Sequence, residues 1–151
     1  MLYIASDHAG YQLKREVVKY LKTQLNKEAK DLGPTAFVEN DDFPDFAFAL
    51  TKEVVKKEDN FGILICGTGQ GMCIAANKVK GARAIIGYNI QATELGRKHN
   101  NANILCLPGR ILPSADFSNA IVKKFLETKF DGDERFVRRN KKIEEAENEN
   151  V

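Results

Sequence analysis

The chain has 151 residues, of which 43% are hydrophobic and 29% charged, as expected of a globular domain with one core. Its net charge of +2 is too small to favour a nucleic acid or a membrane surface as partner, and no apolar stretch approaches the length of a membrane span. The three cysteines form no C-x-x-C pair, and no charged and apolar leader begins the chain. These features favour a reduced, cytoplasmic protein.

Strand-like and helix-like patterns alternate along the chain. In order, the first half predicts a strand at Leu2–Ser6, an amphipathic helix with Leu13, Val17, Leu21 and Leu25 on one face, a weak strand at Ala29–Leu32, an irregular acidic stretch at Thr35–Asp45, and a helix at about Phe46–Lys57. The second half predicts a strand at Phe61–Cys66, a helix at Met72–Val79, a strand at Ala82–Tyr88, a helix at Gln91–Lys98, a strand at Asn103–Leu107, and a helix at Ser114–Thr128. Such alternation predicts an α/β fold with helices on both faces of a parallel sheet.

The last part of the chain has a different composition. From Asp133 to Glu149 charged residues dominate, and the main apolar residues are Phe136, Val137 and Ile143. A helix of this composition cannot bury much of itself on its own domain. We therefore treat residues 1–151 as a single domain with a C-terminal helical extension at about 131–151, which we expect to lie on a partner subunit or to fray.

A glycine-rich loop follows the central apolar run. Cys66 ends that run, and Gly67, Gly69 and Gly71 alternate after it. In open α/β sheets ligands bind beyond the carboxyl ends of the strands, and alternating glycines let backbone N–H groups approach an anion. The loop therefore predicts an anion-binding site with a thiol beside it.

The two common nucleotide-binding motifs do not fit this loop. It lacks the Gly-Lys-Ser/Thr ending of a P-loop, and Met72 stands where the third glycine of a G-x-G-x-x-G fingerprint should be. A turn that only connects strand to helix is the alternative explanation.

Other polar residues gather around the predicted strand ends. Asp7 and His8 follow the first strand, so they should meet Cys66 at one edge of the sheet. Arg110 follows the fifth strand. His99 ends a helix, which by topology places it at the opposite edge. Arg135 and Arg139 are four residues apart, so a helix presents both on one face, an arrangement that suits a phosphate but also fits a merely basic helix start.

Taken together, these motifs resemble the ribose-5-phosphate isomerase B family, which includes the galactose-6-phosphate and allose-6-phosphate isomerases. The resemblance covers nearly the whole chain and rests on Ser6-Asp7-His8-Ala9-Gly10, Asp42-Phe43-Pro44-Asp45, Gly62 through Gly71, Ala75-Ala76-Asn77-Lys78, Gly81-Ala82-Arg83-Ala84, His99-Asn100 with Asn103, Gly109-Arg110, and Arg135 with Arg139. It implies a three-layer Rossmann-like fold and an aldose–ketose isomerase of the pentose phosphate pathway. Such an enzyme moves a proton between C1 and C2 through a cis-enediolate and needs neither metal nor cofactor.

The resemblance also implies roles for individual residues. Cys66 would be the base that exchanges the proton, while the amides of Gly67, Gly69 and Gly71, with Asn100, stabilise the enediolate. The family assigns opening of the sugar ring to His99 with Thr68, and binding of a sugar hydroxyl to Asp7. The residues that would hold the phosphate are His8, Arg110, Arg135 and Arg139. In this family the site lies between the two subunits of a homodimer, so His99 could come from the partner.

Three departures from the family pattern leave the sugar open. Family members commonly carry His where this chain has Phe136, many have Tyr in place of Phe43, and many have Gly in place of Pro108. The resulting pocket is less polar than usual, so a six-carbon 6-phosphate is an alternative substrate. A non-catalytic phosphosugar-binding module is an alternative of another class. A metal site is a third, since Cys66, His8, His99 and Asp7 are all competent ligands, although their spacing matches no zinc signature.

Overall fold

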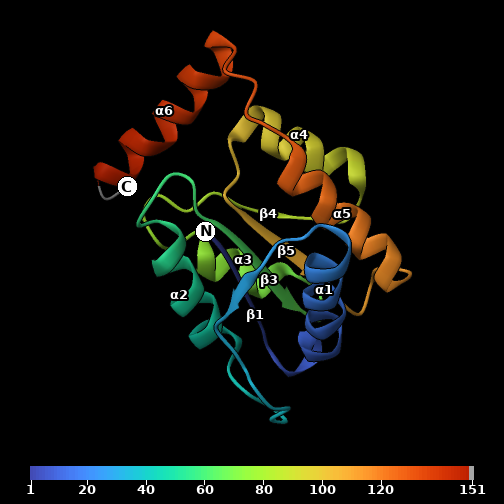
Figure 1. The fold of residues 1–151 in the computed structure, drawn as a ribbon. Coiled ribbons are helices and arrows are strands. Elements are labelled where there is room, and N and C mark those ends of the chain that lie inside the picture. Colours follow the sequence, from blue (N-terminus) through green and yellow to red (C-terminus); the bar gives the residue numbers. More distant parts are fainter. Residues whose placement is uncertain (150–151) are drawn as a thin grey trace.

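A parallel five-stranded sheet forms the centre of the molecule (Figure 1). The computed structural model of the chain describes residues 1–149, so residues 150 and 151 of the expected C-terminal extension lie outside it. The strands are β1 (Leu2–Ser6), β2 (Ala29–Asp31), β3 (Phe61–Cys66), β4 (Ala84–Ile86) and β5 (Ile104–Pro108). Their order in the sheet is β2-β1-β3-β5-β4, and every neighbouring pair is parallel. This confirms the predicted sheet.

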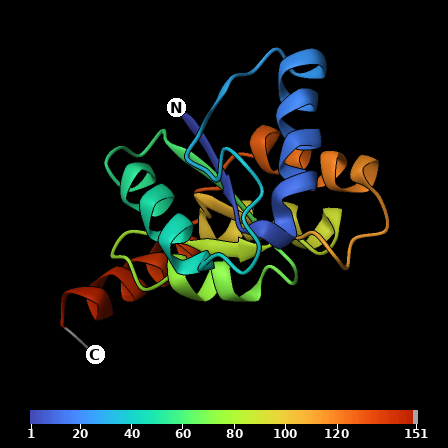
Figure 2. The same cartoon turned by 90° about the horizontal axis from the view of Figure 1, so that it is seen from below.

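Helices cover both faces of the sheet and complete a three-layer α/β fold (Figures 1 and 2). They are α1 (Tyr11–Gln24), α2 (Phe43–Val54), α3 (Gln70–Ala76), α4 (Ile90–Asn100), α5 (Ala115–Glu127) and α6 (Glu134–Asn148), and a short 3-10 turn, η1 (His8–Gly10), precedes α1. Helices α1, α4 and α5 pack on one face, and α2 and α3 pack on the other. The three-layer Rossmann-like prediction is confirmed.

The core consists of one apolar layer on each side of the sheet. The central strand β3 contributes to both layers, since Ile63 and Ile65 face α1 and α5 while Leu64 faces α2 and α3. All three side chains are fully buried. A strand covered on both faces has no position for a polar side chain, which explains its continuous apolar run.

Helices α2 and α3 begin two or more residues earlier than the periodicity predicts. Helix α2 starts at Phe43 instead of Phe46, because Pro44 fits the first turn, where no N–H donor is needed and its fixed φ is suitable. Helix α3 starts at Gln70 instead of Met72, directly after Gly69 in a left-handed conformation with φ of +74°. The glycine loop is therefore shorter than expected, and the chain turns into the helix inside it.

Helix α6 stands apart from the three layers (Figure 1). Only Phe136 and Asn140 of this helix are buried, whereas Val137 and Ile143 are about half exposed. Its contacts are with the end of α4 and with Gly81 and the segment leading into β4. The helix thus buries little of itself on its own chain, as its composition indicates.

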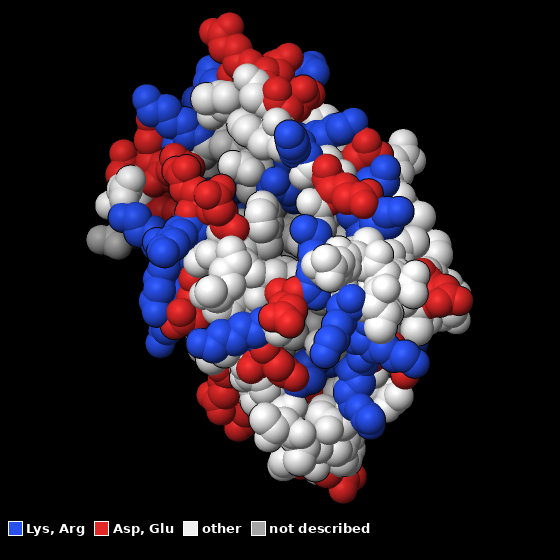
Figure 3. Space-filling view, in the orientation of Figure 1, with Lys and Arg blue, Asp and Glu red and all other residues white. Residues whose placement is uncertain are grey.

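Charges on the surface are mixed in sign. Figure 3 shows acidic and basic side chains interspersed over the face it presents. Within residues 1–149, no helix is both long enough and apolar enough to cross a membrane.

Candidate active site

The carboxyl ends of β1, β3 and β5 bring several predicted residues to one edge of the sheet. The register aligns Ser6 with Ile65 and Cys66 with Pro108. Beyond the strands, the Asp7 N–H donates to Ile65 O over 3.1 Å, and the Gly109 N–H donates to Cys66 O over 2.8 Å. The segments that follow β1 and β5 are therefore tied to the last two residues of β3, Ile65 and Cys66.

The Cys66 thiol lies beneath the glycine loop. Its side chain is buried, and its Sγ accepts a hydrogen bond of 3.1 Å from the Gly69 N–H. A backbone donor in this position stabilises negative charge on the sulfur. Thr68 is exposed, and its Oγ1 lies 3.4 Å from the Gln70 nitrogen. The loop thus places a thiol, a hydroxyl and backbone amide groups next to one another at the mouth of the sheet.

Arg110 comes back to this loop from the end of β5. The backbone N–H of Arg110 donates to Gly67 O over 3.0 Å. A Cβ added at Gly67 would lie 3.4 Å from Arg110 Cδ, so the side chain runs alongside the loop. The edge therefore carries one guanidinium group next to the glycine amides, as a phosphate or sugar oxygen requires.

Asp7 supplies a buried carboxyl group at the same edge. Its Oδ1 accepts from the Gly10 N–H over 2.9 Å. Burial raises the pKa of the Asp7 carboxyl above its ordinary value, although the Gly10 hydrogen bond and the neighbouring His8 act in the opposite direction. Holding a carboxyl group in such surroundings costs stability and indicates a role other than packing.

Sequence reasoning missed Asp41, which holds His8. Asp41 Oδ1 accepts from the His8 N–H over 2.9 Å and lies 2.8 Å from His8 Nδ1. The other oxygen, Oδ2, is buried and has no hydrogen-bond partner among residues 1–149. The two residues are 33 positions apart, and the acidic stretch around Asp41 carries no pattern that would pair it with His8. One carboxylate thus fixes both the backbone and the ring of His8.

A second group of predicted residues lies at the opposite edge of the sheet. Helix α4 runs back from the end of β4 to the start of β5, so His99 and Asn100, at its end, lie near the amino ends of the strands. The His99 ring stacks on Phe136 of α6 with a centroid distance of 4.1 Å and an angle of 19°. The guanidinium carbon of Arg135 lies 4.5 Å from the centroid of the same Phe136 ring. Arg139 is one turn further along α6.

The predicted site residues therefore form two separate groups within one chain. Asp7, His8, Cys66, Thr68, the loop glycines and Arg110 share one edge, which confirms the expected meeting of Asp7, His8 and Cys66. His99, Asn100, Arg135 and Arg139 belong to the α4–α6 junction, in agreement with the topological expectation for His99. No three potential metal-ligating side chains come together in the part of the chain that the structure describes.

Comparisons with known proteins place the chain in a family. The family model described as Ribose/Galactose Isomerase matches residues 2–143. The probable ribose-5-phosphate isomerase B of Mycoplasma genitalium is 47% identical over 150 residues, covering 98% of this chain and 96% of that protein. The ribose-5-phosphate isomerase B of Mycobacterium tuberculosis is 38% identical over 138 residues, covering 91% and 84%.

Solved structures agree with this assignment. The crystal structure of the Mycoplasma genitalium ribose-5-phosphate isomerase B with bound ribulose-5-phosphate is similar with a TM-score of 0.93, at 46% identity over 98% of this chain and 96% of that one. The Clostridium thermocellum ribose-5-phosphate isomerase B gives the same TM-score, at 41% identity over 99% of both chains. The chain belongs to the ribose/galactose isomerase family, and the ribose-5-phosphate isomerases B are among its relatives.

Proposed function

We propose that this protein is an aldose–ketose isomerase that interconverts ribose 5-phosphate and ribulose 5-phosphate. The observation that carries the proposal is the buried Cys66 thiol, bound by the Gly69 N–H at the carboxyl end of the central strand. Full-length similarity to ribose-5-phosphate isomerases B, one of them solved with ribulose-5-phosphate, supports the same activity.

The proton transfer follows from the groups at the glycine loop. Cys66, as thiolate, removes the proton from C2 of the open aldose and returns it to C1. The hydroxyl proton passes from O2 to O1 at the enediolate stage, so the carbonyl moves from C1 to C2. The negative charge that develops on the enediolate oxygens is stabilised by donors, which are the amides of Gly67, Gly69 and Gly71 together with Asn100. These amides belong to a loop tied to β3 and β5, so they need little reorganisation when the charge develops.

The remaining residues bind the sugar phosphate and open its ring. His99, assisted by Thr68, moves the proton that ring opening requires, and Asp7 accepts a hydrogen bond from a sugar hydroxyl. The phosphate is held by four cationic or donor side chains: His8, Arg110, Arg135 and Arg139. The Asp41 clamp on His8 fixes one of these four before the substrate arrives.

A homodimer would unite the two groups of residues. Cys66 and His99 lie at opposite edges of the sheet in one chain, so a complete site needs the second group from another copy. Large apolar side chains exposed around the edge strand β4 support such an interface: Ile74, Tyr88, Ile90 and Leu95. In the dimer, α6 would also cover a partner surface, which accounts for the exposure of Val137 and Ile143.

Subunit mixing tests the shared site. Cys66→Ala and His99→Ala should each be inactive as homodimers, but exchange of subunits should restore part of the activity, because one site of each mixed dimer is intact. Activity that stays absent, with subunit exchange verified by mass spectrometry, would contradict a site built from two chains.

Replacement of the base tests the function itself. Cys66→Ala should lower kcat about 100- to 10,000-fold on the best substrate, because the reaction loses its acid–base group. Cys73→Ala is the matched control, a cysteine of the following helix outside the machinery. If Cys66→Ala keeps most of the wild-type rate, the assignment of the base is wrong.

A six-carbon 6-phosphate is the second candidate substrate. The family description includes galactose, and the Phe43 ring lies against the glycine loop, 2.8 Å from where a Cβ on Gly71 would be. Rates with ribose, allose and galactose phosphates under one set of conditions distinguish these substrates. Binding without exchange of the C2 proton with solvent would instead indicate a non-catalytic phosphosugar-binding module.

The proposal requires no metal or cofactor, because a thiol, an imidazole and backbone amides supply the acid–base and donor groups. Activity in excess chelator should therefore equal that in its absence. We place the protein in the reduced cytoplasm, where a catalytic thiol is preserved, with residues 1–151 acting as one domain.

A further inference from the structure

Three side chains from two helices form a continuous stack at the α4–α6 junction. The Phe136 ring lies against the His99 imidazole at 4.1 Å between centroids, and the Arg135 guanidinium carbon lies 4.5 Å from the centroid of the Phe136 ring. Phe136 is only 4% exposed, although it belongs to the most exposed helix of the molecule. One buried apolar ring therefore touches both a group assigned to ring opening and a group assigned to the phosphate.

The backbone at this point is fixed by the same helix. Asn140 Nδ2 donates to His99 O and to Phe136 O, each over 2.9 Å. Since Phe136 and Asn140 are the two buried residues of α6, the surface that holds α6 to its own chain is the surface that contacts His99.

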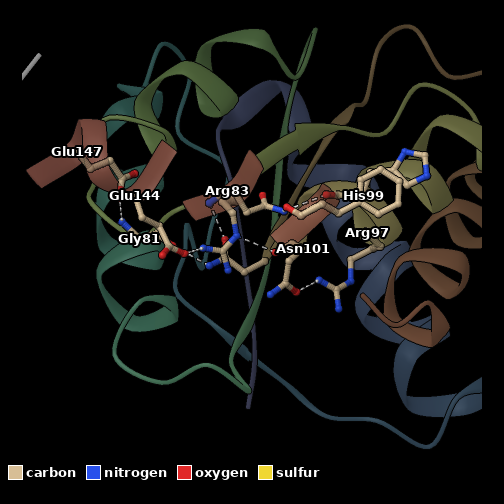
Figure 4. A network of polar contacts seen from close by, with 10 residues as sticks. Gly81, Arg83, Arg97, His99, Asn101, Glu144 and Glu147 are labelled. Atoms are coloured by element: carbon tan, nitrogen blue, oxygen red, sulfur yellow. Dashed lines mark hydrogen bonds and ion pairs between the residues drawn. The ribbon is translucent and has the colours of Figure 1, made fainter. Parts of the chain in front are cut away.

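A polar network fixes the rest of the junction. Figure 4 shows it extending from Glu147 and Glu144 on α6 to Arg83 and Asn101, near His99. Glu147 accepts from the Gly81 N–H over 3.1 Å, Glu144 lies 3.7 Å from Arg83, and Arg83 Nε donates to Asn101 O over 2.9 Å. The end of α4 and the body of α6 are thereby held as one unit.

We propose that Phe136 is a positioning residue that aligns the His99 imidazole for opening of the sugar ring and links it to Arg135 on the phosphate. This inference rests on the proposed function. Ring opening breaks the C1–O4 bond, with one proton lost from the O1 hydroxyl and one gained by O4, so the imidazole must face both oxygens. A flat ring stacked on the imidazole restricts its rotation and leaves its edge, where both nitrogens lie, free to reach the sugar.

The choice of a phenyl ring also has an electrostatic consequence. The Phe136 ring contacts both the His99 imidazole and the Arg135 guanidinium, and it gives the cation a favourable contact with its face. Because the ring carries no titratable group, neither the stack nor the position of Arg135 depends on protonation at residue 136.

Two assays separate positioning of His99 from structural damage. Isomerisation of ribose 5-phosphate begins from a furanose and needs ring opening. Exchange of the C1 hydrogen of ribulose 5-phosphate with D2O begins from an open chain, because the phosphate occupies the C5 oxygen that would close the ring. The exchange uses Cys66 and the loop amides but not the ring-opening step.

Phe136→Leu is the decisive variant, since it keeps a buried apolar group but removes the flat ring. It should lower kcat for ribose 5-phosphate about ten- to a hundred-fold, the effect expected of a misplaced catalytic group, while hydrogen exchange of ribulose 5-phosphate stays near wild type. Phe136→His, which restores a flat ring, should recover most of the rate. Lys22→Ala, at an exposed position of α1 away from both groups of site residues, should leave both assays unchanged.

Proton NMR gives an independent readout, because the chain has only two histidines. The His99 ring protons lie in the shielding region of Phe136 and should move downfield in Phe136→Leu, while those of His8 stay in place. The inference would be overturned if Phe136→Leu isomerised ribose 5-phosphate at the wild-type rate, or if its rates of isomerisation and of hydrogen exchange fell by the same factor. Failure of wild-type enzyme to use ribose 5-phosphate would instead contradict the proposed function.

Discussion

Gly69 is the residue at which the fold and the proposed chemistry depend most directly on each other. Its φ of +74° is a conformation that L side chains adopt at a cost of roughly 1–2 kcal/mol. A Cβ at this position would also lie 3.3 Å from the Pro108 nitrogen and 3.4 Å from the Leu107 carbonyl carbon. These are backbone atoms of β5, so they cannot move aside as a flexible side chain could. Gly69→Ala should therefore disturb the loop as well as strain it.

The expected magnitudes can be worked out from these contacts. Strain and overpacking together should lower the free energy of unfolding by about 2–4 kcal/mol. If the loop shifts to relieve the contact, the Gly69 N–H moves away from Cys66 Sγ, to which it now donates over 3.1 Å. Removing one such donor from a site that stabilises developing charge costs on the order of 100- to 1,000-fold in kcat.

Gly132→Ala is a matched control, because it measures the cost of the left-handed backbone conformation without a steric contact of the new Cβ. Gly132 has a similar φ of +70°, but a Cβ there would meet nothing within 4 Å. Gly132→Ala should lower the free energy of unfolding by only about 1 kcal/mol and keep full activity. Urea unfolding and steady-state kinetics on both variants make the comparison. If the two alanine variants lose equal stability and both keep wild-type kcat, the reasoning about the loop is refuted.

Three other predictions follow from the site and its surroundings. Asp7→Asn should keep the Gly10 hydrogen bond but lower kcat/KM about ten- to a hundred-fold, through loss of a charged hydrogen bond to the sugar. Burial raises the pKa of the Asp7 carboxyl above its ordinary value of 3.8, so the stability that this group contributes is complete below pH 3.8 and is lost as the pH rises. Asp7→Asn should therefore have a higher melting temperature than wild type at neutral pH and lose this advantage in acid. Equal melting temperatures of the two proteins at both pH values would contradict this reasoning. Asp41→Ala should raise KM about tenfold with little change in kcat, because His8 loses its clamp, whereas the exposed Asp42→Ala should not. Arg97→Met should lower the free energy of unfolding in urea by about 3 kcal/mol, because Asn101 Oδ1 and the carbonyls of Ala102 and Thr128 lose their donor. A decrease of less than about 1 kcal/mol would refute that account.

The layers of the fold could be predicted because their causes are local. Apolar runs such as Phe61–Cys66 and helical stripes such as Val17 with Leu21 each repeat at the period of the element that they form, and burial then selects the face. Boundaries were less accurate where local chemistry overrides periodicity. Pro44 starts α2 inside a stretch expected to be irregular, and Gly69 starts α3 inside the loop.

The sequence by itself determined that a thiol ends an apolar strand, that alternating glycines follow it, and that Asp7, His8 and Cys66 share an edge, because parallel strands end on the same side. Only the tertiary structure decided the contacts between distant segments. Asp41 reaches His8 across 33 residues, and Asn140 reaches His99 across 41. No periodic pattern encodes such pairs, since they depend on the path of a loop and the docking of α6. The structure alone also revealed that the Phe136 ring stacks on the His99 imidazole.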